Sequence, residues 1–120
     1  MIRYEQKSSD VIPMEELLNI FTNVLKKFEL TNSEIRIYSL LLDEQLTARQ
    51  IAKRLGLSER IVREKLRHLL ELGLVERKLV NRGWIGYIYW AKAPREALKV
   101  LLSKMEEIIR SMEKEANKIL

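Results

Sequence analysis

Apolar residues recur at steps of three and four along five stretches of the chain, the spacing that places side chains on one face of an α-helix. The clearest run lies after Pro94, where Leu98, Leu102 and Met105 begin a stripe that continues to the end of the sequence. The pattern predicts helices over about residues 13–29, 32–44, 48–55, 59–72 and 94–120.

Three of these helices begin with a side chain that can cap the helix N-terminus. Thr31 is followed three positions later by Glu34, and Thr47 by Gln50, so both pairs fit a capping box. Ser58 stands in the same place before the next helix. These signals place the N-termini of the three central helices.

The period changes to that of β-strands after residue 73. Residues 74–80 and 84–90 are rich in β-branched and aromatic side chains, and Asn81-Arg82-Gly83 separates them. Gly83 can adopt the positive φ that a three-residue hairpin loop requires. The two segments are therefore expected to pair as an antiparallel hairpin.

The order of the elements predicts a winged helix-turn-helix, a mostly α fold with a small β-hairpin wing (α+β). The turn is Gly56-Leu57-Ser58, between a short helix and a longer one. We expect three regions: residues 1–30 as an N-terminal tail and helix, 31–93 as the winged unit, and 94–120 as a long C-terminal dimerisation helix.

Composition excludes several classes of function. The chain has no Cys and one His, His68, too few ligands for a zinc site and too few groups for a Cys-His or Ser-His-Asp centre. It also has no glycine-rich phosphate loop, so neither an enzyme nor a cofactor is expected. No apolar run is long enough to span a membrane, and a cytoplasmic location is expected.

The distribution of charge points to a polyanionic partner. Residues 46–83 hold ten Lys and Arg against four Glu, a net +6, whereas the remaining residues hold twelve basic and thirteen acidic side chains, a net −1. The positive surplus thus lies entirely on the predicted helix-turn-helix and hairpin. That segregation is typical of a protein that binds duplex DNA.

Two sequence motifs in this region carry a family resemblance. The stretches ARQIAKRLGLS, residues 48–58, and LRHLLELGLVER, residues 66–77, resemble the DNA-binding domain of archaeal TrmB-like regulators, with MarR-like and ArsR-like proteins nearby. The resemblance implies a winged-helix transcription regulator that binds DNA. Longer TrmB regulators carry a sugar-binding domain after the linking helix, and these 120 residues contain no counterpart, so the effector stays open.

Helix geometry selects the candidate DNA contacts. With Val62 facing the core, a rotation of 100° per residue turns the arginines of the second helix outward, where the N-terminal part of a recognition helix meets base edges. The candidates on this helix are Ser58, Arg60, Arg63, Glu64 and Arg67. Arg49 and Gln50, on the supporting helix, are expected to contact phosphates, and Lys78, Asn81 and Arg82 to contact DNA from the wing.

Several of these residues have a simpler interpretation. Any single Arg can belong to a solvated face, and Glu64 can pair with Arg60 or His68. His68 fits a flanking surface residue better than a pH switch. The hairpin aromatics are expected to pack the wing against the helices rather than to stack on bases; they are Trp84, Tyr87, Tyr89 and Trp90.

The apolar seam of the last helix predicts a homodimer. A lone helix with such a seam is unstable in water, and a second copy covers it economically. The seam residues are Leu98, Leu102, Met105, Ile109, Met112 and Ile119. Alternatively, the first and last helices pack together in a monomer. A dimer would bind an inverted-repeat duplex site; the alternative function is a protein–protein adaptor with the same fold.

Overall fold

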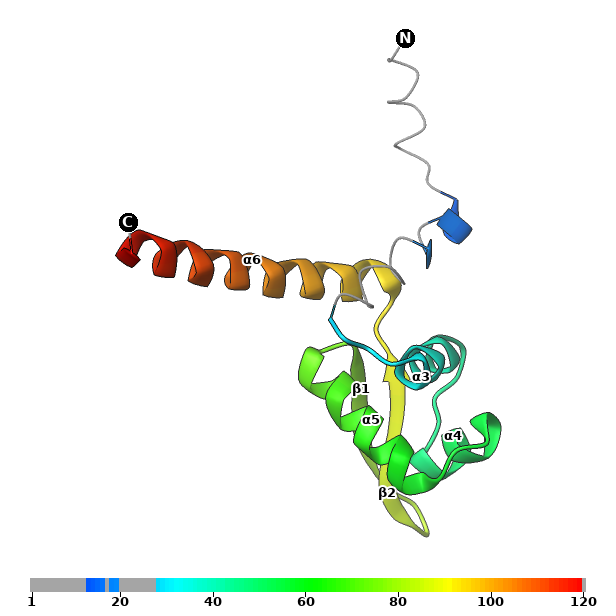
Figure 1. Ribbon diagram of the computed structural model, residues 1–120. Helices are drawn as coiled ribbons and strands as arrows, with labels where there is room; N and C mark the ends of the chain where they lie inside the picture. Colours follow the sequence, from blue (N-terminus) through cyan, green and yellow to red (C-terminus); the bar gives the residue numbers. More distant parts are fainter. Residues whose placement is uncertain (1–12, 17, 20–27, 120) are drawn as a thin grey trace. The chain divides into compact units, whose positions relative to one another are not determined.

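The structure is a computed structural model that describes residues 13–16, 18–19 and 28–119. The chain divides into two compact units, Met1–Leu30 and Thr31–Leu120. The helices and strands of the second unit are α3 (Asn32–Asp43), α4 (Ala48–Leu55), α5 (Glu59–Leu72), β1 (Val75–Asn81), β2 (Ile85–Ala91) and α6 (Pro94–Ile119) (Figure 1). The predicted fold class, mostly helical with one antiparallel hairpin, is confirmed.

The predicted first helix lies largely outside the described residues. Residues 14–16 and 18–19 are helical, as expected, and Met14 and Leu18 are exposed. The prediction that this helix supports a core or a dimer therefore stays a prediction.

The three predicted N-caps are present. The Thr31 hydroxyl accepts from the Glu34 backbone N–H at 3.2 Å, and the Glu34 carboxylate accepts from the Thr31 N–H at 2.9 Å. Thr47 and Gln50 repeat the arrangement at the start of α4. These reciprocal bonds satisfy backbone donors that a helix start otherwise leaves unpaired, so they fix where each helix begins.

The hairpin begins one residue later than the sequence predicts. Asn81 pairs with Ile85, so the loop consists of Arg82, Gly83 and Trp84 rather than residues 81–83. Gly83 adopts a φ of +74°, and the Arg82 N–H donates to the Trp84 carbonyl at 3.0 Å. The glycine is thus the middle residue of the loop, and Trp84 belongs to the turn instead of the strand.

Two contacts attach β2 and the segment after it to the helices. Leu46 exchanges two backbone hydrogen bonds with Tyr89, at 3.1 and 2.8 Å, which adds a short bridge to the hairpin. The Tyr38 hydroxyl donates to the Lys92 carbonyl at 2.5 Å, and burial raises the pKa of Tyr38 well above its usual value. These contacts hold the base of the hairpin against α3 and α4.

α6 packs on the winged unit only near its start. Ala97 and Leu101 are fully buried, whereas Leu102, Ile109 and Met112 are 45%, 52% and 65% exposed. Figure 1 shows the rest of the helix extending away from α5 and the hairpin. Among the described residues, Leu102, Ile109 and Met112 of the predicted seam are therefore uncovered; the side chain of Ile119 is outside this part of the chain.

Candidate DNA interface

The start of α4 presents Arg49 and Gln50 at the surface. Both side chains are exposed, as predicted. The Oε1 of Gln50 accepts from the Thr47 backbone N–H at 2.9 Å, so the capping box already uses this acceptor. The side-chain amide N–H groups of Gln50 take no part in this bond, so they can donate to an external acceptor.

α5 has the two faces that the sequence predicts. Its inner face is buried through Val62, Leu66 and Leu69. The predicted contact residues Arg60, Arg63, Glu64 and Arg67 are all exposed. The arginine-bearing face of α5 is thus available to solvent.

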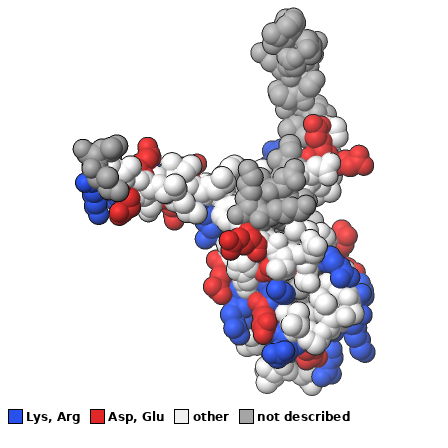
Figure 2. Space-filling view, in the orientation of Figure 1, with Lys and Arg blue, Asp and Glu red and all other residues white. Residues whose placement is uncertain are grey.

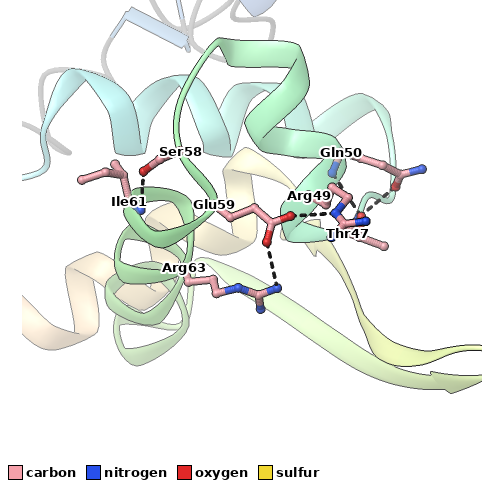
Figure 3. Close-up of polar contacts among 7 residues, drawn as sticks. All are labelled: Thr47, Arg49, Gln50, Ser58, Glu59, Ile61 and Arg63. Carbon is pink, nitrogen blue, oxygen red and sulfur yellow. Dashed lines mark hydrogen bonds and ion pairs between the residues drawn. The ribbon is translucent and has the colours of Figure 1, made fainter.

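Two polar contacts organise this exposed face of α5. The Ser58 hydroxyl oxygen accepts from the Ile61 N–H at 3.2 Å and caps the helix, which leaves its own O–H as a donor (Figure 3). Arg60 and Glu64 approach to 4.0 Å, one turn apart, and both side chains are more than half exposed. An exposed pair at this distance is weak, so Arg60 can exchange Glu64 for another acceptor.

An acidic residue that the sequence analysis did not select lies between predicted contact residues of two helices. Glu59, the first residue of α5, accepts a hydrogen bond from Arg49 Nε at 2.8 Å, and its other oxygen lies 3.7 Å from Arg63 (Figure 3). The hydrogen bond from Arg49 lowers the pKa of Glu59, and the same bond raises the pKa of Arg49. One carboxylate therefore joins predicted contacts from two helices.

A trough runs between α5 and the hairpin. It consists of two adjoining hollows that share Arg63, Tyr87 and Tyr89; one extends to Arg49 and the other to Arg67 and Arg77. We call this surface the α5–hairpin trough. It brings four arginines of three elements along one open channel, and Glu59 and Glu71 are its acidic members.

The sequence did not lead us to select Arg77 as a contact residue, although the face of the strand on which it lies could be inferred. Side chains alternate between the two faces of a strand, so Arg77 shares a face with the fully buried Val75, which points toward the helices. Its guanidinium carbon lies 4.0 Å from the centre of the Tyr87 ring. The cation–π contact holds Arg77 over the wall of the trough.

The predicted wing residues lie apart from the trough. Lys78 neighbours Arg77 along β1, so it points to the opposite face of the hairpin. There it lines a separate hollow with Asn81, Arg82 and Trp90. The structure therefore gives the hairpin cations on both faces and at its tip.

The hairpin aromatics divide between packing and exposure. Tyr89 is buried, as expected, and Trp90 is half-buried with its Nε1 donating to Glu76 at 3.1 Å. Trp84 and Tyr87 are 46% and 38% exposed, so neither is fully covered, although Tyr87 lies opposite Leu66 and Leu70 of α5; for these two the expected packing stays a prediction. Trp84 turns back over Gly86 because it belongs to the loop.

His68 is part of a contact between helices. Its side chain is 40% exposed, and Nδ1 hydrogen-bonds to Oε2 of Glu34, which is buried at the start of α3. Burial by itself would raise the pKa of Glu34, but the hydrogen bonds from Thr31 and His68 lower it overall. His68 thus serves the joint between α3 and α5, and it pairs with Glu34 rather than with Glu64.

Basic side chains gather over the winged unit. Figure 2 shows Lys and Arg spread over the region of α4, α5 and the hairpin with fewer acids between them, whereas uncharged side chains predominate along the visible face of α6. Among residues 13–16, 18–19 and 28–119, no group of acidic residues and histidine is arranged to hold a metal ion. In the same part of the chain, no helix is long and apolar enough to cross a membrane.

Family comparison agrees with this geometry. Residues 25–95, more than half of the chain, match the family described as sugar-specific transcriptional regulator TrmB. The chain belongs to the TrmB family. It is therefore a winged-helix transcriptional regulator of TrmB type. No curated protein matches the chain.

Solved structures share the fold at low sequence identity. A possible transcriptional regulator from Methanosarcina mazei Go1 is 16% identical, with 89% of this chain and 88% of that chain covered and a TM-score of 0.62. A Sulfolobus tokodaii protein is 19% identical, with coverages of 79% and 97% and a TM-score of 0.61. A Lactococcus lactis ZitR mutant in complex with DNA is 22% identical, with coverages of 74% and 62% and a TM-score of 0.51.

Proposed function

We propose that this TrmB-family chain is a cytoplasmic homodimer that binds double-stranded DNA sequence-specifically and regulates transcription. One observation carries the proposal: α5 buries its apolar stripe and exposes Arg60, Arg63 and Arg67 beside a basic hairpin. A helix is the element that fits the major groove of B-DNA. The similarity in fold to a ZitR mutant in complex with DNA supports the same function.

Base reading is assigned to the outermost side chains of α5. Arg60 and Arg67 can each donate two hydrogen bonds to guanine, and Glu64 can accept from cytosine. Ser58 can donate its hydroxyl proton to a base or a phosphate at the helix start. Because these residues lie on one exposed face, they are suited to successive bases of one site.

Phosphate contact is assigned to the part of the α5–hairpin trough that Arg49 and Arg63 line. Arg49 and the Gln50 amide lie at the N-terminus of α4, where backbone N–H groups also attract anions. Arg63 lies between them and Arg67 along the same channel. We propose that one DNA strand follows this trough with its backbone.

The hairpin is proposed to reach the flanking minor groove. Two phosphate strands border that groove, so a wing inside it needs cations on both faces. Arg77 on one face, Lys78 on the other and Arg82 in the loop meet this requirement. Asn81, next to Arg82, can contribute a hydrogen bond to sugar or base.

The homodimer is proposed to form along α6. The helix has 26 residues and leaves large apolar side chains uncovered, and such stripes on a chain are usually binding surfaces. Leu98, Leu102, Met105, Ile109 and Met112 are spaced so that a second copy of α6 can cover them. Two recognition helices about 34 Å apart, or a multiple of that, would then bind an inverted repeat.

Selection from a random duplex pool followed by titration tests the proposal. The selected duplex should bind more tightly than scrambled DNA, and its affinity should fall on the order of a thousandfold between 50 and 200 mM salt if six or more phosphates are contacted. Light scattering should give the mass of two chains. Weak binding without sequence preference would favour the adaptor function instead.

A further inference from the structure

Glu59 is the acidic side chain that lies between two arginines of the proposed interface. It accepts from Arg49 Nε at 2.8 Å and lies 3.7 Å from Arg63 Nη2 (Figure 3). The Arg49 and Arg63 side chains are 78% and 58% exposed, whereas Glu59 is 37% exposed. The carboxylate thus sits behind two guanidinium groups that remain open to solvent.

The contacts use little of the donor capacity of the arginines. A guanidinium carries five N–H donors, and Glu59 takes only the Nε–H of Arg49. The terminal Nη atoms of Arg49, which suit an incoming phosphate, lie outside this hydrogen bond. The distance of 3.7 Å between Arg63 Nη2 and Glu59 is longer than a hydrogen bond. The carboxylate of Glu59 therefore attracts Arg63 without occupying its donors.

We infer that Glu59 is a positioning residue for DNA binding, which holds Arg49 and Arg63 so that one backbone phosphate can bind both. This inference rests on the proposed DNA-binding function. Two like charges on neighbouring helices repel, and the carboxylate between them offsets that repulsion. The carboxylate also restricts the long side chains of Arg49 and Arg63 before DNA binds, so they lose less rotamer freedom on binding.

The sign of the mutational effect separates positioning from simple charge. Glu59→Ala removes a negative charge from a surface that would face DNA, so electrostatics alone would tighten binding. Positioning predicts the opposite, a loss of about two- to fivefold in affinity for the selected duplex, the size expected for an exposed pair. Because Arg49 and Arg63 would contact phosphate less well in Glu59→Ala, the fall of DNA affinity with salt should also become shallower.

Two further variants, one at Glu59 itself and one on α6, are the controls. Glu59→Gln removes the same charge but keeps an acceptor oxygen for Arg49, so it should bind between the wild-type protein and Glu59→Ala. Glu107→Ala removes one charge from the exposed surface of α6, where no salt bridge to Glu107 is found among the described residues. Because Glu107 lies outside the proposed DNA interface, this variant should bind DNA as the wild-type protein does.

A double-mutant cycle with Arg49 completes the test. If Glu59 acts through Arg49, then Glu59→Ala should cost clearly less affinity in an Arg49→Ala background than in the wild-type chain. Circular dichroism melts of every variant define the temperatures at which all of them are folded, and the titrations are carried out within that range. Tighter binding by Glu59→Ala, or an undiminished loss in the Arg49→Ala background, would overturn the inference.

The wild-type titration separates this inference from the function on which it rests. A wild-type protein that shows no salt-dependent binding to duplex DNA refutes the proposed function, and the role of Glu59 with it. A wild-type protein that binds, with a Glu59→Ala variant that binds more tightly, refutes the positioning role alone.

Discussion

His68 Nδ1 on α5 hydrogen-bonds to the buried carboxylate of Glu34 in the first turn of α3. A carboxylate can only accept, so the imidazole N–H donates. Glu34 also accepts from both the backbone and the hydroxyl of Thr31. The carboxylate that completes the capping box of α3 therefore also holds α5 against α3.

Replacing Glu34 should separate these two roles. Gln at this position can still complete a capping box, as Gln50 does in α4, but it cannot offer His68 a charged partner. We expect Glu34→Gln to lower the free energy of unfolding by about 1–3 kcal/mol, and Glu34→Ala to cost about 1 kcal/mol more because the box is lost. Urea unfolding at neutral pH measures both. An unchanged Glu34→Gln variant would show that capping alone matters, and equal losses would show that the contact with His68 alone matters.

The same pair makes a pH-dependent contribution to stability. The pKa of Glu34 is lower in the folded chain than its ordinary value of 4.5, so the stabilisation is complete above pH 4.5 and is lost as pH falls through the folded value. Urea titrations of the wild-type protein and Glu34→Gln should therefore converge below pH 4.5. A constant difference across that range would contradict the assignment.

Arg60 and Arg63 should differ in what they contribute to DNA binding. Arg60 lies on the outermost face of α5, and we expect Arg60→Ala to relax preference at one base pair at a cost of about 1–3 kcal/mol. Arg63 lies in the trough, and Arg63→Ala should weaken all sequences alike and reduce the salt slope by about one. Competition titrations with single-base variants of the selected duplex distinguish them; uniform loss for Arg60→Ala would reassign it to a phosphate.

Local signals made most of the fold predictable. Short segments of sequence are enough to predict the capping boxes at Thr31 and Thr47 and the glycines that end α4 and α5. The hairpin loop was displaced by one residue because Gly83 can occupy more than one place in a short loop. The structure places it in the middle, which transfers Trp84 to the turn.

The candidate site was harder to predict from the sequence because its side-chain contacts join residues that are far apart along the chain. The outward arginines of α5 follow from helical geometry, but Glu59 meets Arg49 across ten positions and His68 meets Glu34 across 34. Neither partner can be chosen without knowing how the helices cross. Arg77 is different, since the alternation from the buried Val75 was sufficient to place it on the trough face.

Arg77 should add a phosphate contact from the hairpin. Because its guanidinium lies over the Tyr87 ring, Arg77→Ala should reduce the salt slope by about one without changing base preference. Tyr87→Phe keeps the ring and should bind as the wild type does, whereas Tyr87→Leu removes the π face and should cost up to about 1 kcal/mol. Lys104→Ala on α6 removes the same charge far along the chain and should leave the slope unchanged.

The α6 seam gives the prediction on which the two-site DNA complex depends. Met112 is 65% exposed on the seam, and Met112→Glu would place a charge where the partner helix packs. We expect a shift from dimer to monomer in light scattering, together with a large loss of affinity for the inverted repeat and little loss for a half-site. Ser103→Glu places the same charge on the opposite side of the helix, since nine residues rotate the position by half a turn, and it should stay dimeric. A dimer unaffected by Met112→Glu would move the contact between copies to another surface, and the spacing of the recognition helices would then no longer follow from α6.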